Sequence, residues 1–283
     1  ETSLSWQAGK LSLDARYRRI MPEYETFGVN YLLTDLEAYT LNPRYTFAEG
    51  RVMLGLSAGW QNNNLDGRLL QNTSRFIGSF DVNINTSDTW GLFAQYSNFS
   101  LEQQVVLDSV RQDSFAIDQI SHNFTLSPRI SLDQDEVIHH FFINANYQLF
   151  NDNNPATADF SENTLALISL NYLLTFKNRG LNLKASANYL DFNAEAFTNQ
   201  QVGCLVGLTK TFGDRKLTLG AHGQFARTMS DDFTANNLTY RFTGDLRLNA
   251  KSTLSLRYNG LRNQREGAGF TESRGELRWR WRL

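Results

Sequence analysis

The four histidines are the first residues to examine for catalysis, because hydrolysis needs a base beside a nucleophile or an activated water. They stand at His122, His139, His140 and His222. Ser121 and Asn123 flank His122, but adjacent residues of an extended strand point to opposite faces, which separates this histidine from both. The same alternation prevents His139 and His140 from ligating one metal ion. We therefore predict that the chain is not an enzyme and has no catalytic residues, no metal site and no cofactor.

Carboxylates are numerous in the segments between the apolar patterns. They include Asp108, Asp113, Asp118, Asp133, Asp135, Asp152, Asp159, Asp231 and Asp232. A calcium site needs several oxygen ligands that converge from one tight loop. The pair Asp231 and Asp232 and the run 133–136 both lack a repeat of ligands with a glycine at its turn. We predict that these carboxylates are solvated loop residues.

Arginine is the most frequent charged residue on the polar face of the β-strands that are predicted below. The positions expected to point inward are Arg16, Arg18, Arg44, Arg51, Arg75, Arg129, Arg241, Arg247, Arg257, Arg278, Arg280 and Arg282. If the last strand closes against the first, a basic wall of the lumen forms from Arg16, Arg18, Arg241, Arg247, Arg257, Arg278, Arg280 and Arg282. One hypothesis is an anion-preferring lumen, since rings of arginine favour anions. The favoured alternative is that these arginines pair with Asp14, Asp81, Asp245 and a plug, because polar groups inside a barrel need partners.

Composition limits the elements that can position these side chains. The 283 residues are 41% hydrophobic with a mean hydropathy of −0.42, so apolar and polar residues are interspersed. No run approaches the roughly 18–20 apolar residues of a transmembrane helix. The single cysteine, Cys204, excludes an intrachain disulfide framework. The net charge of −2 gives no reason to expect a nucleic-acid partner.

Strict alternation of apolar and polar residues is the main structural signal, because it is typical of β-strands with one apolar face. From Leu238 to Leu248, every second residue is apolar or glycine and the residues between them are polar. The predicted strands are 2–8, 11–20, 36–47, 51–61, 74–85, 88–99, 115–132, 136–150, 162–177, 179–192, 199–212, 215–228, 237–249, 252–262 and 271–283. Most have at least the roughly 9–11 residues that a tilted strand needs to cross a bilayer.

The predicted connections alternate in length. Tight turns are expected at 48–50, 86–88, 133–136, 178–180, 213–215 and 250–252. Longer polar loops are expected at 21–35, 62–73, 100–114, 151–161, 193–198, 229–236 and 263–270. Short turns on one side and long loops on the other are the pattern of outer-membrane barrels.

All five tryptophans fall on the apolar face of their predicted strands. They are Trp6, Trp60, Trp90, Trp279 and Trp281, and we predict that they form an interfacial aromatic girdle. The alternative is a large water-soluble β-structure with a dry core. A closed ring of about fourteen strands is too wide for side chains to fill, which disfavours that alternative.

Three short segments carry a resemblance to known proteins. The ending Gly275–Leu283, with Trp279 and Trp281, resembles the C-terminal insertion signal of outer-membrane barrels but closes on Leu in place of Phe or Trp. The stretch Tyr17–Tyr24 and the stretch Tyr96–Phe99 look similar to parts of large Bacteroidota outer-membrane proteins. In those proteins a C-terminal barrel follows other sequence. The resemblance implies a compartment and a lineage, and little about activity.

The predicted fold is all-β: a transmembrane antiparallel up-and-down β-barrel of about 14 strands (14–16). Residues 1–283 form one outer-membrane barrel domain, in which 1–10 are a partial or extra strand. Bacterial single-chain barrels normally have an even number of strands. A fifteenth strand would therefore indicate that further sequence precedes Glu1.

Two functions remain open from the sequence. The favoured one is a non-enzymatic structural or partner component of a multi-protein assembly in the cell envelope of a Gram-negative bacterium. The alternative is a passive, porin-like solute channel with an arginine-lined lumen. Either one predicts an outer-membrane location in contact with lipid and lipopolysaccharide. The first also predicts contact with other envelope proteins, and neither involves nucleic acid.

Overall fold

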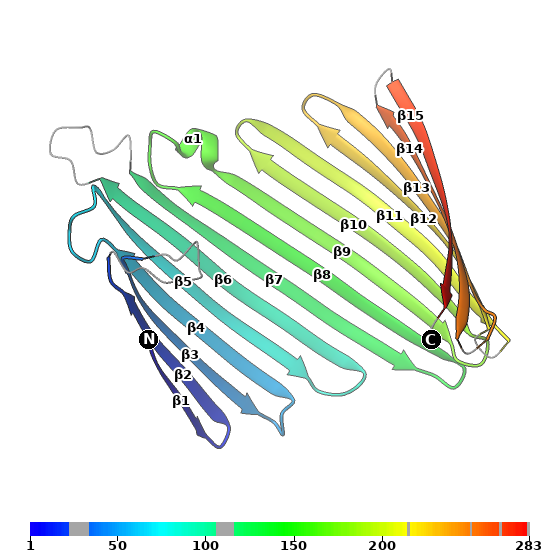
Figure 1. The fold of residues 1–283 in the computed structure, drawn as a ribbon, viewed down its shortest axis with the longest axis horizontal. Helices are drawn as coiled ribbons and strands as arrows, with labels where there is room; N and C mark the ends of the chain where they lie inside the picture. Colours follow the sequence, from blue (N-terminus) through cyan, green and yellow to red (C-terminus); the bar gives the residue numbers. More distant parts are fainter. Residues whose placement is uncertain (23–33, 106–115, 214–215, 250, 266–267, 282–283) are drawn as a thin grey trace.

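The computed structural model describes residues 1–22, 34–105, 116–213, 216–249, 251–265 and 268–281. They form one antiparallel sheet of fifteen strands whose order in space follows their order in the sequence (Figure 1). The predicted all-β, antiparallel up-and-down fold is confirmed. The strand count lies inside the predicted range but one above the fourteen favoured from the sequence.

The strands are β1 (Thr2–Ala8), β2 (Leu11–Ile20), β3 (Leu36–Phe47), β4 (Val52–Asn63), β5 (Gln71–Asn85), β6 (Trp90–Val105), β7 (Ile117–Asp133), β8 (Val137–Asp152), β9 (Asn163–Phe176), β10 (Leu181–Ala194), β11 (Phe197–Phe212), β12 (Leu217–Ser230), β13 (Thr234–Arg247), β14 (Ser252–Arg265) and β15 (Ala268–Trp281). One short helix, α1 (Ala158–Ser161), lies between β8 and β9. No helix in the described part of the chain has the length and apolar character to cross a membrane.

The first strand is a full member of the sheet. It pairs with β2 over its whole length, from Thr2 opposite Tyr17 to Ala8 opposite Leu11. Gly9 turns the chain between the two strands with a φ of 58°, a conformation that glycine adopts without strain.

The connections differ at the two ends of the strands. At one end, called here the turn end, all connections between consecutive strands are short, as predicted. At the opposite loop end, only the first four connections are long. The predicted loops 193–198, 229–236 and 263–270 are wrong, because the strands continue through most of those residues. Only two residues separate β10 from β11, and three separate β12 from β13.

Side-chain contacts explain why the β10–β11 hairpin extends so far. The rings of Phe192 and Phe197 lie 5.1 Å apart across it. The carboxylate of Asp231, in the next connection at the loop end, accepts hydrogen bonds from the Thr198 backbone N–H (2.6 Å) and hydroxyl (2.5 Å). The polar composition of residues 193–198 predicted a loop, but these contacts stabilise the strands on both sides of a short turn.

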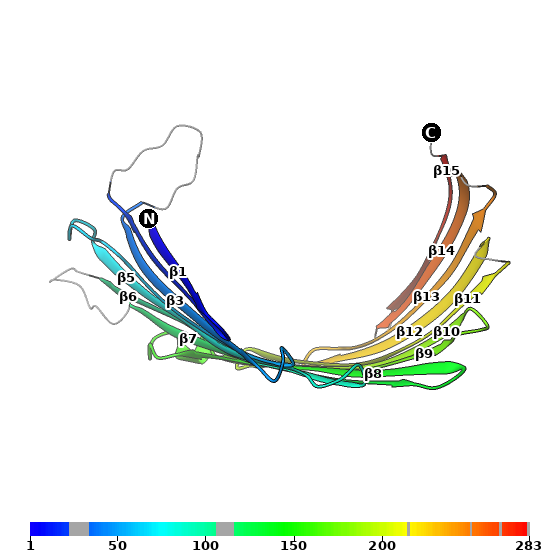
Figure 2. The same ribbon diagram turned by 90° about the horizontal axis from the view of Figure 1, so that it is seen from below.

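The sheet is bent into a trough, with the two ends of the chain at opposite rims (Figure 2). Among the described residues, β1 pairs only with β2 and β15 pairs only with β14. Because neighbouring strands alternate in direction, the first and the fifteenth run the same way. A direct pairing between β1 and β15 would therefore be parallel, unlike every pairing inside the sheet.

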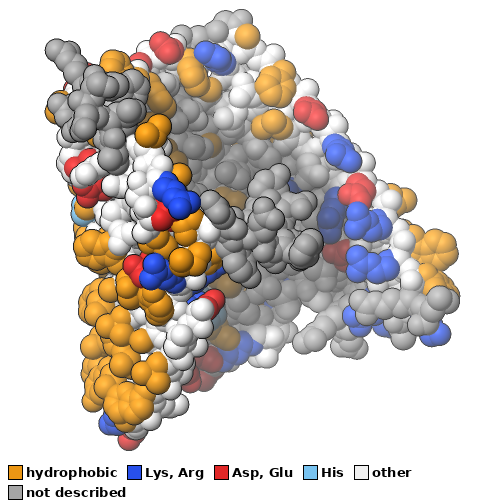
Figure 3. Space-filling view, turned by 60° about the vertical axis from the view of Figure 1, so that its left-hand side comes forward, with side chains coloured by type: hydrophobic (Ala, Val, Ile, Leu, Met, Phe, Trp, Pro, Cys, Tyr) orange, Lys and Arg blue, Asp and Glu red, His pale blue; other side chains and the backbone are white. Residues whose placement is uncertain are grey.

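The pairing register keeps the mainly apolar and the mainly polar side chains of the strands on opposite faces of the sheet. One row of the apolar face joins Leu246, Leu254 and Trp279 across three strands. Figure 3 shows hydrophobic side chains on the outside of the trough and charged side chains around its hollow. We call the outside the convex face and the inside the concave face. No large side chain of the described residues is fully buried, so a packed core does not hold the sheet together. Backbone pairing and contacts between neighbouring strands stabilise it.

Candidate functional site

The basic residues of the concave face concentrate on the last three strands. Alternation directs Arg241 and Arg247 of β13 to the same face as Arg257 of β14 and Arg278 and Arg280 of β15. The pairing register brings these arginines near one another: Arg257 stands opposite Glu276, and Thr253 stands between Arg247 and Arg280. This cluster, called here the basic wall, contains five of the eight arginines predicted for it.

The first-strand part of the predicted wall lies elsewhere. Arg16 and Arg18 belong to β2, and β1 lies between them and the rim. Arg16 contacts Glu1, with 3.6 Å between Nε and the carboxylate Oε1. The sequence analysis joined these arginines to those of β13–β15 on the condition that the last strand pairs with the first. The described residues contain no pairing between β15 and β1. Arg282 lies outside the described residues.

The arginines of the basic wall are only partly neutralised. Glu276 accepts from Arg278 Nη2 at 2.7 Å, and Asn259 accepts from Arg241 Nε at 2.7 Å. Two of the three acids expected to pair with arginines bind serines: Asp14 accepts from Ser5 at 2.6 Å, and Asp245 accepts from Ser255 at 2.5 Å. Short side chains on the neighbouring strand reach these carboxylates more directly than the arginines do.

A second concave feature is apolar. We call it the concave apolar band, and it consists of Ile77, Phe99, Phe150, Leu165, Leu167, Leu190, Phe192 and Phe197. Ile77 stands opposite Phe99, and Leu167 stands opposite Leu190. These side chains have few neighbours above the sheet: Ile77 is 50% exposed, Phe99 38% and Phe197 47%. Sequence reasoning missed the band, because it took the inward face as polar on every strand.

The five tryptophans all lie on the convex face, at the ends of strands. Trp6, Trp90, Trp279 and Trp281 are near the turn end, and Trp60 is near the loop end. The indole N–H of Trp279 donates to Ser252 Oγ at 2.7 Å. Their role as an aromatic girdle stays a prediction.

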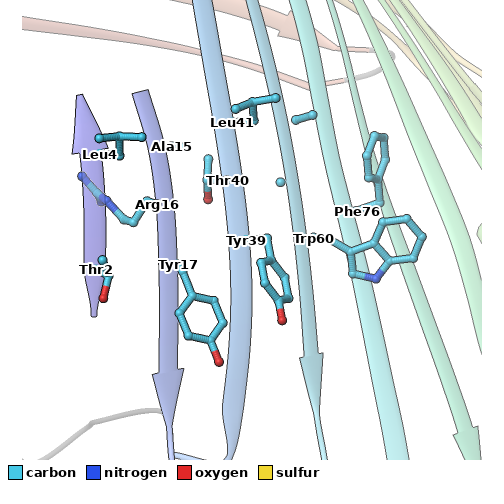
Figure 4. A pocket seen from close by; sticks show the side chains of 12 residues that line it. Thr2, Leu4, Ala15, Arg16, Tyr17, Tyr39, Thr40, Leu41, Trp60 and Phe76 are labelled. Carbon is cyan, nitrogen blue, oxygen red and sulfur yellow. The ribbon is translucent and has the colours of Figure 1, made fainter. Parts of the chain in front are cut away.

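Trp60 belongs to a larger aromatic row that the sequence analysis did not single out. Tyr17, Tyr39, Trp60 and Phe76 are consecutive partners from β2 to β5. Figure 4 shows them beside Leu4 and Leu41 around a shallow groove of about 440 Å³. The Tyr17 hydroxyl donates to Glu37 Oε1 at 2.8 Å, toward the loop end. An apolar ring with its polar atom directed to the strand end suits a boundary between hydrocarbon and water.

The histidines each have one side-chain partner or none. On the convex face, His122 Nδ1 bonds Tyr96 Oη and His139 Nδ1 bonds Tyr172 Oη, both at 2.8 Å. On the concave face, His140 Nδ1 bonds Ser131 Oγ at 2.8 Å. The described residues contain no group of three or more histidines, cysteines and carboxylates that would hold a metal ion.

Comparison with known proteins gives structural likeness only. No family model matches the sequence, and no curated protein matches it. Among solved structures, the chain is similar to the FrpB iron transporter of Neisseria meningitidis, with 8% identity, 93% of this chain and 58% of that chain covered, and a TM-score of 0.44. It is also similar to the alcaligin outer-membrane receptor FauA of Bordetella pertussis, with 11% identity, coverage of 86% and 49%, and a TM-score of 0.45. For CdiB of Acinetobacter baumannii the identity is 8%, the coverage 94% and 59%, and the TM-score 0.40. This chain spans less than two thirds of the length of each of the three.

Proposed function

We propose that this chain is an integral β-barrel protein of the bacterial outer membrane, of the Bacteroidota type. In this proposal it is a non-enzymatic component of a multi-protein cell-envelope assembly. The sequence resemblance at Tyr17–Tyr24 supports the lineage.

The convex face supports the location. Its exposed side chains include Leu256, Leu277 and Trp279, which are 54%, 68% and 66% exposed. In water, a continuous apolar face of this extent would drive aggregation. In a bilayer, strands of this length span the hydrocarbon and the same face contacts lipid.

The concave apolar band is the observation that carries the partner role. The inner wall of a water-filled channel is polar, so exposed Phe and Leu side chains there are costly unless another surface covers them. The band extends from β5 to β11, across the floor of the trough and onto both of its walls (Figure 2). We infer that an apolar surface of a partner protein packs onto it.

Gentle detergent extraction of native membranes, followed by mass analysis, tests this proposal. We expect stoichiometric companions that are lost when Phe99 and Phe197 are both replaced by Ser. The matched control is Phe270→Ser, because Phe270 is also concave and exposed but lies on β15, outside the band. Companions that survive the double substitution, or a protein that extracts alone, would contradict the partner role.

The basic wall favours a second candidate, a passive channel with an anion preference. The side chains of Arg247, Arg257 and Arg280 have no hydrogen-bond or ion-pair partner among the described residues, so they are available to mobile anions. Planar-bilayer recording distinguishes the two candidates. An anion-selective open conductance that falls on Arg257→Gln supports the channel, and a protein without conductance contradicts it.

A further inference from the structure

A cavity of about 720 Å³ lies on the concave face near the turn end, between β5 and β9. Its lining includes the polar side chains of Arg129, Ser131 and His140 and the apolar side chains of Phe93, Phe142 and Leu173. Phe142 stands directly opposite Arg129 on the neighbouring strand. It is separate from the concave apolar band, which lies toward the loop end of the same strands, and from the basic wall on β13–β15.

The guanidinium of Arg129 is hydrogen-bonded at one of its nitrogens. Its Nη2 donates to Asn85 Oδ1 at 2.6 Å. It lies across Gly91, where an added Cβ would be 2.5 Å from Arg129 Nε and 3.1 Å from Asn85 Oδ1. The absence of a side chain at Gly91 therefore gives Arg129 its position. Its remaining N–H groups have no partner among the described residues.

Ser131 and His140 add two further polar atoms on neighbouring strands. They are direct cross-strand partners, and the serine hydroxyl bonds His140 Nδ1 at 2.8 Å. That bond leaves the second ring nitrogen of His140 available to a ligand.

The charge of the cavity is positive. The described residues that line it include no carboxylate. Asp133, two residues beyond Ser131, forms an ion pair with Lys177. The apolar surface next to Arg129 remains open, since its cross-strand partner Phe142 is 37% exposed. A guanidinium with unused donors beside exposed aromatic and aliphatic carbons matches a ligand that has one anionic end and one apolar end.

We propose that this cavity binds a small carboxylate with an aromatic or aliphatic body. The carboxylate accepts from Arg129, because the planar guanidinium fork matches carboxylate geometry. Ser131 and His140 contact the same polar end, and the body lies on Phe142, the direct cross-strand partner of Arg129. The volume is in the range of small-molecule sites. This inference goes beyond the proposed function and does not depend on the partner role.

The test uses 4-fluorobenzoate as the probe and fluorine NMR line broadening as the readout. The folded protein is measured in detergent, and empty micelles are the background. We expect saturable broadening above that background, reversed by benzoate. Acetate, which lacks the body, and benzamide, which lacks the charge, should each compete at least about tenfold more weakly, as for a lost charge-assisted hydrogen bond. Absence of saturable broadening, or equal competition by acetate or benzamide, would overturn the proposal.

Three variants locate the site. Arg129→Gln removes the cation, and Gly91→Ala keeps the charge but displaces it, so both should weaken binding about tenfold or more. Arg129→Lys should restore part of the affinity. The matched control is Arg44→Gln, which removes a concave arginine of β3 outside the cavity and should leave affinity unchanged. An equal loss in the control would assign the effect to overall charge and refute the site. Heat-dependent migration on a gel verifies that each variant is folded.

Discussion

At the residue scale, the two faces of one strand should respond oppositely to a charge. Phe242 lies mid-strand on the convex face of β13 and is 51% exposed, while the next residue, Thr243, lies on the concave face. Phe242→Arg should lower the free energy of unfolding from a bilayer by about 2–4 kcal/mol, and Thr243→Arg should have a far smaller effect. Reversible unfolding from lipid vesicles measures both. Equal losses would contradict the assignment of the faces.

A carboxylate at the loop end gives a second residue-scale prediction. The hydrogen bonds from the Thr198 hydroxyl and backbone N–H hold the pKa of Asp231 below its ordinary value. A lowered pKa means that the contact is intact above the ordinary value, about 3.9, and is lost as the pH falls through the folded value. An NMR titration of the Asp231 carboxyl should show the lowered midpoint. Thr198→Val removes one donor and should raise it, and an unchanged midpoint would refute this cause.

At the scale of the element, the turn between β3 and β4 concentrates backbone strain. Ala48, Glu49 and Gly50 all have positive φ, at 52°, 59° and 87°. Gly50→Ala should cost about 1 kcal/mol, because the left-handed region disfavours a Cβ even where space is open. Glu49→Gly should stabilise the turn by a similar amount. The control is Gly223→Ala in β12, which meets open space without a positive φ. The unfolding midpoints of the three variants check this prediction: Glu49→Gly should have the highest midpoint and Gly50→Ala the lowest.

Elements also show how far the sequence predicts the structure. Alternation gave the bounds of β2 and β3 and the face of every tryptophan, because a period of two is visible in any single strand. The concave apolar band was not predictable in this way, since its rows appear only when the register sets Ile77 against Phe99. The contact of Arg129 on β7 with Gly91 on β6 was not predictable either, because it depends on the conformation of the arginine side chain, which residue spacing does not indicate.

At the scale of the whole molecule, the two rims give a test of closure. Gln7 of β1 and Arg280 of β15 are both concave and near the turn end. In a Cys204→Ser background, cysteines at these two positions should not form a disulfide, because the rims lie apart and run the same way. The positive control is Thr253 with Arg280, which are direct partners. A disulfide between residues 7 and 280 would show that the sheet closes on itself with a parallel seam.

The strictly sequential strand order has a mechanical consequence. Among the described residues, every strand pairs only with the strands before and after it in the chain, so the sheet behaves as a linear array of neighbouring units. A pulling force applied at either end meets one hairpin at a time, and of the strands that remain only the one next to that hairpin loses a partner. Extraction from a membrane should then proceed as a series of steps, each releasing one strand pair of about thirty residues, as for repeat arrays.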